Sequence, residues 1–98
     1  MQKHKMYIGG EWVEAAGGEW FESLNPYTGQ PWALVPRGGA GDVDRAVEAA
    51  HQAFVSGDWP ALTATQRGAL LRKLGDLLAE NAEHLGRTET QDNGKLIA

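Results

Sequence analysis

The sequence contains no cysteine, which excludes disulfide bonds, zinc–thiolate sites and a cysteine nucleophile from this chain. It also lacks any apolar run near the ~18 residues that a membrane-spanning helix requires. The N-terminal stretch "MQKHKMYIGG" carries charge but no apolar core of the kind found in secretory signals. We therefore expect no membrane partner, and a cytoplasmic location.

Basic residues are few and scattered along the chain. Nine Lys and Arg stand against 13 Asp and Glu, giving a formal net charge of −4. Proteins that bind nucleic acid usually carry a basic stripe or patch, so we expect no nucleic-acid partner. Without such a patch, the four tryptophans are better explained as core or interface anchors than as platforms for stacked bases.

Large apolar side chains are also scarce. Much of the 42% hydrophobic fraction is alanine, and 13 glycines add unfolded-state entropy without adding side-chain burial. A chain of 98 residues with this composition lies at the small end of the single-domain range. Independent folding is therefore possible but not assured by composition.

Residues 6–36 show the pattern of short strands broken by turns. Aromatic and β-branched residues flank Gly9-Gly10 in "MYIGGEWV", and further strands are predicted over 19–24 and 31–36. Because proline cannot donate a ladder hydrogen bond, Pro31 must lie at a strand start or on an edge strand. The "NPYTG" stretch between these strands predicts a hairpin turn, with the Asn side chain accepting from the backbone and Gly29 in the left-handed region.

Helical periodicity replaces the strand pattern from Asp42 onward. Apolar residues recur at helical spacing and predict one buried face. The members of this face are Val43, Ala46, Val47, Ala50 and Phe54. The segment "GDWP" should end the helix, because Pro60 disfavours helical geometry at Trp59.

A second helical segment has a clearer start. Thr63 and Gln66 have the spacing of a capping box. A leucine stripe follows, formed by Leu70, Leu74, Leu77, Leu78 and Leu85. We expect a break near Asn81 and a stop at Gly94.

Motifs that could carry chemistry are weak. Gly39 and Gly41 resemble half of a phosphate-binding loop, but Asp42 and Asp44 would repel a phosphate there. The three histidines share no metal-ligand spacing, the carboxylate pairs are typical of solvated faces, and no serine has a readable His and acid partner. We therefore predict no catalytic residue and no cofactor-binding residue within this chain.

The ordered set of segments resembles the N-terminal portion of the NAD(P)-dependent aldehyde dehydrogenases. The resemblance rests on "YIGGEWV", "FESLNPYTGQPWALVP", "DVDRAVEAAHQAF" and the final "ETQDNGK", in family order and spacing. It implies an α/β fold in which residues 1–98 form an incomplete N-terminal part of a Rossmann-type cofactor-binding domain. Strands and hairpin would occupy residues 6–36, and two or three helices would occupy residues 42–94.

The resemblance also implies an activity that this chain alone lacks. In the complete enzymes a cysteine attacks the aldehyde, hydride passes to NAD or NADP, and a glutamate-activated water releases the carboxylic acid. Both catalytic residues lie in family segments beyond residue 98, so the chain by itself is expected to be inactive. Its expected partner is the remainder of the aldehyde dehydrogenase polypeptide, in an enzyme that is usually a homo-oligomer.

One site is implied within the chain. Some family members hold a structural Na⁺ or K⁺ ion, with ligands from the strand before the Asn-Pro turn and from the aspartate of the E-T-x-D-x-G-K motif. The corresponding residues are Ser23, Leu24 and Asp92, whose carbonyl and carboxylate oxygens suit a hard cation. The alternative is that Asp92 simply ends a helix and accepts backbone or solvent hydrogen bonds.

A second function remains open from the sequence. The chain could be a stand-alone, non-catalytic structural or interaction module derived from the same family. The apolar residues Leu96, Ile97 and Ala98 favour the hypothesis that the chain is the N-terminal portion of an aldehyde dehydrogenase, because they look like the first residues of a continuation. We expect the leucine stripe and Phe54 to be exposed in the isolated chain.

Overall fold

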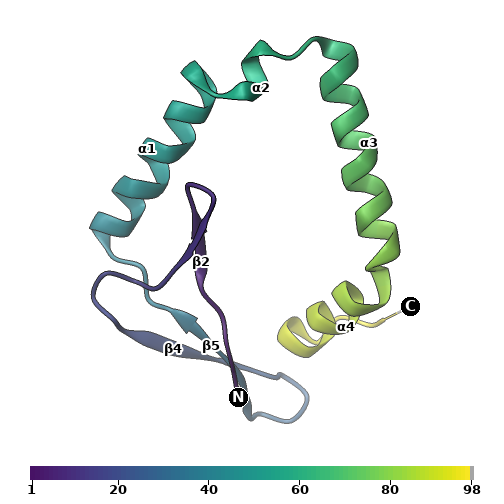
Figure 1. The fold of residues 1–98 in the computed structure, drawn as a ribbon. Coiled ribbons are helices and arrows are strands. Elements are labelled where there is room, and N and C mark those ends of the chain that lie inside the picture. The colour runs from purple at the N-terminus through teal and green to yellow at the C-terminus, as the bar shows by residue number, and fades with distance from the viewer. Residues whose placement is uncertain (98) are drawn as a thin grey trace.

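The computed structural model describes residues 1–97, in which short strands precede the helices (Figure 1). The strands are β1 (Gln2–Lys3), β2 (Met6–Ile8), β3 (Glu11–Val13), β4 (Trp20–Leu24) and β5 (Pro31–Pro36). The helices are α1 (Ala40–Ser56), α2 (Asp58–Ala61), α3 (Ala64–Glu80) and α4 (Ala82–Asn93). The predicted α/β order of strands followed by helices is confirmed.

The three-stranded sheet has the order β1-β5-β4, with β1 parallel and β4 antiparallel to the central β5. Pro31 is the first residue of β5, as predicted. The turn that joins β4 and β5 also forms as predicted. The Tyr27 amide donates to Asn25 Oδ1 at 2.9 Å, and Gly29 has φ of 71°.

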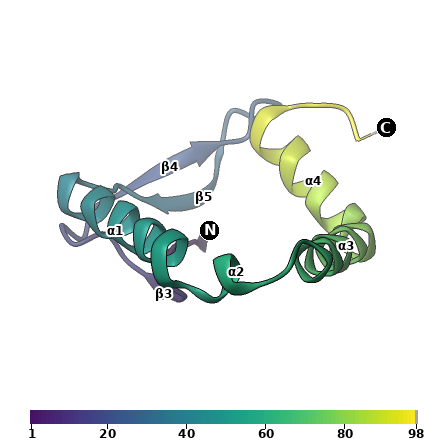
Figure 2. The ribbon, with the colours of Figure 1, turned by 90° about the horizontal axis from the view of Figure 1, so that it is seen from above.

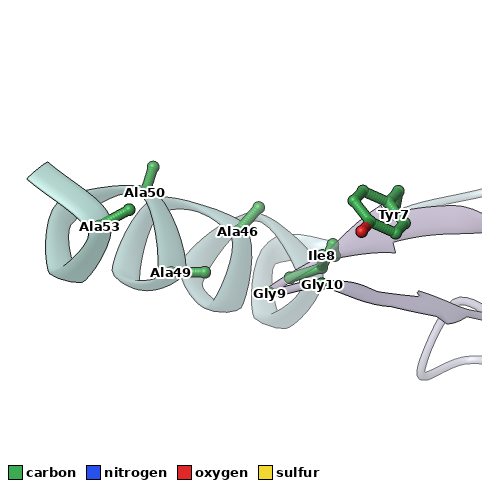
Figure 3. Close-up of a pocket in the computed structure, with 8 residues that line it drawn as sticks. All are labelled: Tyr7, Ile8, Gly9, Gly10, Ala46, Ala49, Ala50 and Ala53. Carbon is green, nitrogen blue, oxygen red and sulfur yellow. The ribbon is translucent and has the colours of Figure 1, made fainter. Parts of the chain in front are cut away.

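The β2–β3 hairpin is separate from this sheet and lies against α1. Its turn residues Gly9 and Gly10 have φ of 61° and 84°, which suits the tight turn of a two-residue hairpin loop. A side chain on Gly9 would lie 3.8 Å from Ala49 Cβ, so the turn approaches the helix closely. Figure 3 shows this turn beside the alanine face of α1.

The face of α1 toward the hairpin overlaps the predicted one only at Ala46 and Ala50. The hollow between hairpin and helix is lined on the helix side by Ala46, Ala49, Ala50 and Ala53 (Figure 3). Val43, Val47 and Phe54 are 58%, 61% and 74% exposed, so the predicted apolar face is only partly covered. The hairpin turn can approach closely only where the helix side chains are small, which selects the alanines.

The prediction that Pro60 keeps Trp59 out of a helix is wrong. After α1 ends at Ser56, both residues lie in the short helix α2, which begins at Asp58. The amides of the first turn of a helix need no intrahelical partner, so a proline there removes no hydrogen bond. A new helix can therefore begin just before Pro60.

The boundaries of α3 and α4 follow the sequence signals. The Gln66 amide donates to Thr63 Oγ1 at 3.2 Å, and Gln66 Oε1 accepts from the Thr63 amide at 2.8 Å. Asn81 separates the two helices, and Gly94 ends α4 in the left-handed region with φ of 78°. The capping box, the break and the stop are all confirmed.

The four helices form an arch that leaves the sheet at α1 and returns to the β4–β5 turn at α4 (Figures 1 and 2). The Cα radius of gyration is 17.0 Å, against about 13 Å for a compact domain of this size. Within residues 1–97, only Ala15, Ala33, Pro36 and Asp42 are buried. The arch therefore encloses no single hydrophobic core. No helix in these residues has the length and apolar character needed to cross a bilayer.

Candidate functional site

The strongest candidate site joins the end of β4 to the end of α4. The Ser23 hydroxyl donates a hydrogen bond to Asp92 Oδ1, across 69 positions of sequence. Ser23 is half-buried because its strand pairs with β5, where Ala33 lies opposite. Gly94 brings the chain beyond α4 against the same turn, since a side chain there would lie 3.5 Å from the Pro26 ring. The structure thus brings together two of the three predicted cation ligands.

The third predicted ligand, Leu24, follows Ser23 on β4. The β4–β5 register shifts between these two residues, and Leu24 lies opposite Pro31. Pro31 has no amide hydrogen, so it cannot donate to a carbonyl of β4. The carbonyls of β4 and the Asp92 carboxylate provide oxygen donors only, which is the donor set that hard cations prefer. The residues present therefore fit a Na⁺ or K⁺ ion in kind.

The Ser23–Asp92 junction opens onto a shallow hollow of about 360 Å³ between the sheet and α4. Trp32 and Leu85 line it from opposite sides. The Trp32 indole Nε1 is buried and has no hydrogen-bond partner within residues 1–97. In the same part of the chain, no three His, Asp or Glu side chains gather to form a metal cluster.

A second polar junction lies at the N-terminus of α1. The Asp42 carboxylate accepts from the Gly39 amide at 2.9 Å and from the Ala16 amide at 3.1 Å, and it pairs with Arg45. The Gly39 and Ala16 amides, together with the Arg45 charge, hold the pKa of Asp42 below its ordinary value, although desolvation opposes them. Asp42 thereby ties the loop after β3 to the start of α1.

The same contact involves Gly39, which with Gly41 resembles half of a phosphate-binding loop. The amide of Gly39 already donates to a carboxylate of the protein itself, at the position where an external anion would bind. From the sequence, Asp42 was considered only as a charge that would repel a phosphate, and its role as a link between the loop after β3 and α1 was not predicted. An acidic residue three positions after Gly39 was the available signal, because it has the spacing of a capping box.

The whole chain was compared with known proteins. A family model described as "Aldehyde dehydrogenase family" matches residues 12–98. A (Z)-2-((N-methylformamido)methylene)-5-hydroxybutyrolactone dehydrogenase from Acinetobacter baylyi is 46% identical over 97 residues, covering 99% of this chain and 20% of the relative. Acetaldehyde dehydrogenase 2 of Cupriavidus necator is 45% identical over 96 residues, covering 98% of this chain and 19% of the relative.

Solved structures show the same backbone. An aldehyde dehydrogenase from Bacillus cereus, solved with NAD⁺, superposes with a TM-score of 0.93 and 44% identity, over 98% of this chain and 20% of that one. An NAD-dependent aldehyde dehydrogenase from Sinorhizobium meliloti gives a TM-score of 0.92 and 32% identity, over 99% and 20%. The chain spans about a fifth of the length of these relatives and matches the N-terminal part of their fold. The family match, the identities and the shared backbone together show that the chain belongs to the aldehyde dehydrogenase family.

Proposed function

We propose that this chain is the N-terminal part of an NAD(P)-dependent aldehyde dehydrogenase, which oxidises an aldehyde to a carboxylic acid. The observation that carries the proposal is the family match over residues 12–98, with 46% identity to a relative that is itself a dehydrogenase. The aldehyde, and the choice between NAD and NADP, would be decided by parts of the enzyme that this chain does not include.

The role proposed for the chain is structural. Residues 1–98 would form the outer strands and helices of the Rossmann-type cofactor-binding domain, without supplying a catalytic or cofactor-binding residue. The sequence has no cysteine to act as the nucleophile, which supports this division of labour. The proposal also includes a cytoplasmic location, homo-oligomeric assembly of the complete enzyme, and the remainder of the polypeptide as the partner of this chain.

A chimeric enzyme tests the proposal. In the Bacillus cereus enzyme, the segment matched by this chain would be replaced by residues 1–98. We expect this chimera to produce NADH or NADPH from an aldehyde, measured at 340 nm, and the purified 98-residue chain to produce none. A well-folded chimera without activity, or turnover by the chain alone, would contradict the proposal. The alternative hypothesis, a stand-alone module, instead predicts that the 98-residue chain is monomeric and unfolds in a sharp thermal transition.

We further propose that Ser23, Leu24 and Asp92 hold a structural Na⁺ or K⁺ ion in the complete enzyme. The all-oxygen donor set and the Ser23–Asp92 contact support this assignment. The melting temperature of the chimera should be higher in NaCl or KCl than in choline chloride of equal ionic strength. Asp92→Asn should abolish this difference, and Asp76→Asn, on the exposed surface of α3, should retain it. Equal melting temperatures in all three salts would refute the site.

A further inference from the structure

The last turn of α4 ends on an Asn-Gly pair. Asn93 is the final residue of the helix, and Gly94 follows it in the left-handed region with φ of 78°. Both residues are exposed to solvent. Asn93 Oδ1 accepts a hydrogen bond from the Lys95 amide at 2.8 Å. This Asx turn holds the side-chain carbonyl of Asn93 close to the main chain that follows it.

The pair has the atoms needed to form an intramolecular imide. The Gly94 nitrogen, after losing its proton to water, can attack Asn93 Cγ. An N–C bond then forms, the Cγ–Nδ2 bond breaks, and ammonia leaves after taking up a proton from water. A water molecule opens the five-membered imide at either carbonyl, which gives an aspartyl or an isoaspartyl residue at position 93. The two steps together exchange water for ammonia, so they require no oxidant, cofactor or second enzyme.

Two local features favour this attack at Asn93. Gly94 has no Cβ to shield its nitrogen from the side chain of the preceding residue. In addition, the Lys95 amide already donates to Asn93 Oδ1, the atom on which negative charge develops in the tetrahedral intermediate. A donor aimed at that atom stabilises the intermediate in the manner of an oxyanion hole.

The sequence has two other asparagines, and each lacks one of these features. Asn25 forms the same kind of turn, but the residue after it is proline, whose nitrogen carries no hydrogen and cannot be deprotonated for attack. Asn81 is followed by an alanine, and its side-chain amide donates to the Leu77 carbonyl at 2.9 Å. Asn93 is therefore the reactive position, with two matched asparagines in the same chain.

The end of helix α4 opposes the reaction. The Gly94 amide donates to the Thr90 carbonyl at 2.9 Å, so its nitrogen is available for attack only when the last turn opens. Helix ends open locally at low cost in free energy, unless other contacts hold them. The Ser23–Asp92 hydrogen bond is such a contact, because it ties this turn to β4 (Figure 1).

We propose that Asn93 is a site of spontaneous deamidation, at a rate limited by opening of the last turn of α4. The inference concerns the covalent state of the chain and is independent of the proposed function. The reaction adds one negative charge to the formal net charge of −4, next to Asp92 and at a helix C-terminus, where the dipole disfavours it. The isoaspartyl product also inserts a methylene into the main chain before Gly94. Deamidation therefore loosens the end of α4 and its contact with Ser23.

Ageing of the 98-residue chain in neutral buffer tests the assignment. Trypsin releases Asn93 in residues 88–95, Asn81 in residues 74–87 and Asn25 in residues 6–37, so tandem mass spectrometry can follow all three. We expect residues 88–95 to gain the mass difference between an amide and a carboxylic acid, with an isoaspartyl fraction that an isoaspartyl methyltransferase labels. A sample digested before ageing corrects for deamidation during digestion. An unmodified Asn93, or equal conversion of all three asparagines, would overturn the assignment.

Three variants test the part played by the helix. Ser23→Ala removes the hydroxyl that holds the last turn, so Asn93 should deamidate several-fold faster than in wild type, yet more slowly than in guanidinium chloride. Ser56→Ala, at the exposed end of α1, is the control and should leave the rate unchanged. Asn93→Gln keeps an amide but would need a six-membered ring, so it should block the reaction. Equal rates in the folded and unfolded wild-type chain, or no acceleration by Ser23→Ala, would refute the limitation by helix opening. Conversion of residues 88–95 in Asn93→Gln would refute the site itself.

Discussion

The sheet-bearing half of the molecule, residues 1–57, and its helical half, residues 58–97, are stabilised in different ways. In the first half, segments distant in sequence are joined by backbone hydrogen bonds. The His4 amide donates to the Leu34 carbonyl at 3.0 Å, and the Arg37 amide donates to the Glu19 carbonyl at 2.9 Å. In the second half, nearly all hydrogen bonds are local to one helix or one cap. Its one side-chain hydrogen bond to the sheet half is the Ser23–Asp92 contact.

This difference shows which half has more stabilising contacts within the chain. Hydrogen bonds and small-residue contacts define the sheet, the hairpin and the start of α1 within the chain. The helical half presents an apolar face to solvent and has capping residues but little packing. We therefore expect the first half to be the more protected from hydrogen exchange in the isolated chain, and the second half to gain protection in the complete enzyme.

The largest effect on this contrast should come from Asp42→Ala. The substitution leaves the Gly39 and Ala16 amides without their acceptor and removes the partner of Arg45. Unpaired amides in a partly buried junction destabilise it, so the first half should lose its advantage. The measurement is hydrogen exchange by NMR, in which the amides of Ala16 and Gly39 should lose protection first.

Asp44→Ala is the matched control for this change. Asp44 lies in the same first turns of α1 but is exposed. It should change the exchange of residues 1–57 only slightly, through the helix dipole. Equal exchange rates in Asp42→Ala and Asp44→Ala would show that the Asp42 link does not stabilise the first half.

Acid should weaken the same junction. Because the pKa of Asp42 is lowered in the folded chain, its carboxylate contributes stability above the unfolded-state pKa of 3.8, and this contribution is lost as pH falls through the folded pKa. The amide of Asp42→Asn does not titrate, so this variant has no carboxylate to protonate as pH falls. The difference in stability between wild type and Asp42→Asn should therefore be greatest near neutral pH and shrink below pH 4, as measured by urea unfolding. A difference that grows on acidification would contradict the assignment.

Two glycines in the helical half should respond in opposite directions. Gly94 has φ of 78°, where an alanine is strained, so Gly94→Ala should destabilise the end of α4 by about 1–2 kcal/mol. Gly86 lies inside α4 with open space around it, so Gly86→Ala should stabilise the helix by about 0.5–1 kcal/mol. Helix content by circular dichroism should fall in the first variant and rise in the second. A rise in helix content for Gly94→Ala would contradict its role as a helix stop.

The local features of the fold could be predicted because each depends on neighbouring residues. The Asn25 turn, the Thr63–Gln66 box and the Gly94 stop are set by short-range geometry. Pairing of β1 with β5 was not predicted, because two exposed residues carry no strand pattern. Likewise, the helix face that meets the hairpin depends on where Gly9 lies in space, which the 3.6-residue period does not report.

The candidate site was predicted only through family resemblance. Nothing in the sequence separation of Ser23 and Asp92 indicates that they meet, because their contact requires the whole arch to return to the sheet (Figure 1). The Asp42 link has a local half, to Gly39, that the capping-box spacing could have shown. The second hydrogen bond of the link, from the Ala16 amide, depends on the path of the loop after β3 and could not be predicted from the sequence.

An effect smaller than that of Gly94→Ala should come from Thr63→Ala, which gives the sharpest test of whether the two halves are independent. The change removes the hydroxyl that accepts the Gln66 amide and should destabilise the start of α3 by about 1 kcal/mol. Because α3 lacks tertiary support, this loss should appear as fraying of α3 in the isolated chain, with no change in the exchange of the sheet amides. Thr65→Ala, inside the helix, is the control and should preserve the helix start. If Thr63→Ala also loosened the sheet, the halves would fold as one cooperative unit, and the contrast between them would have to be abandoned.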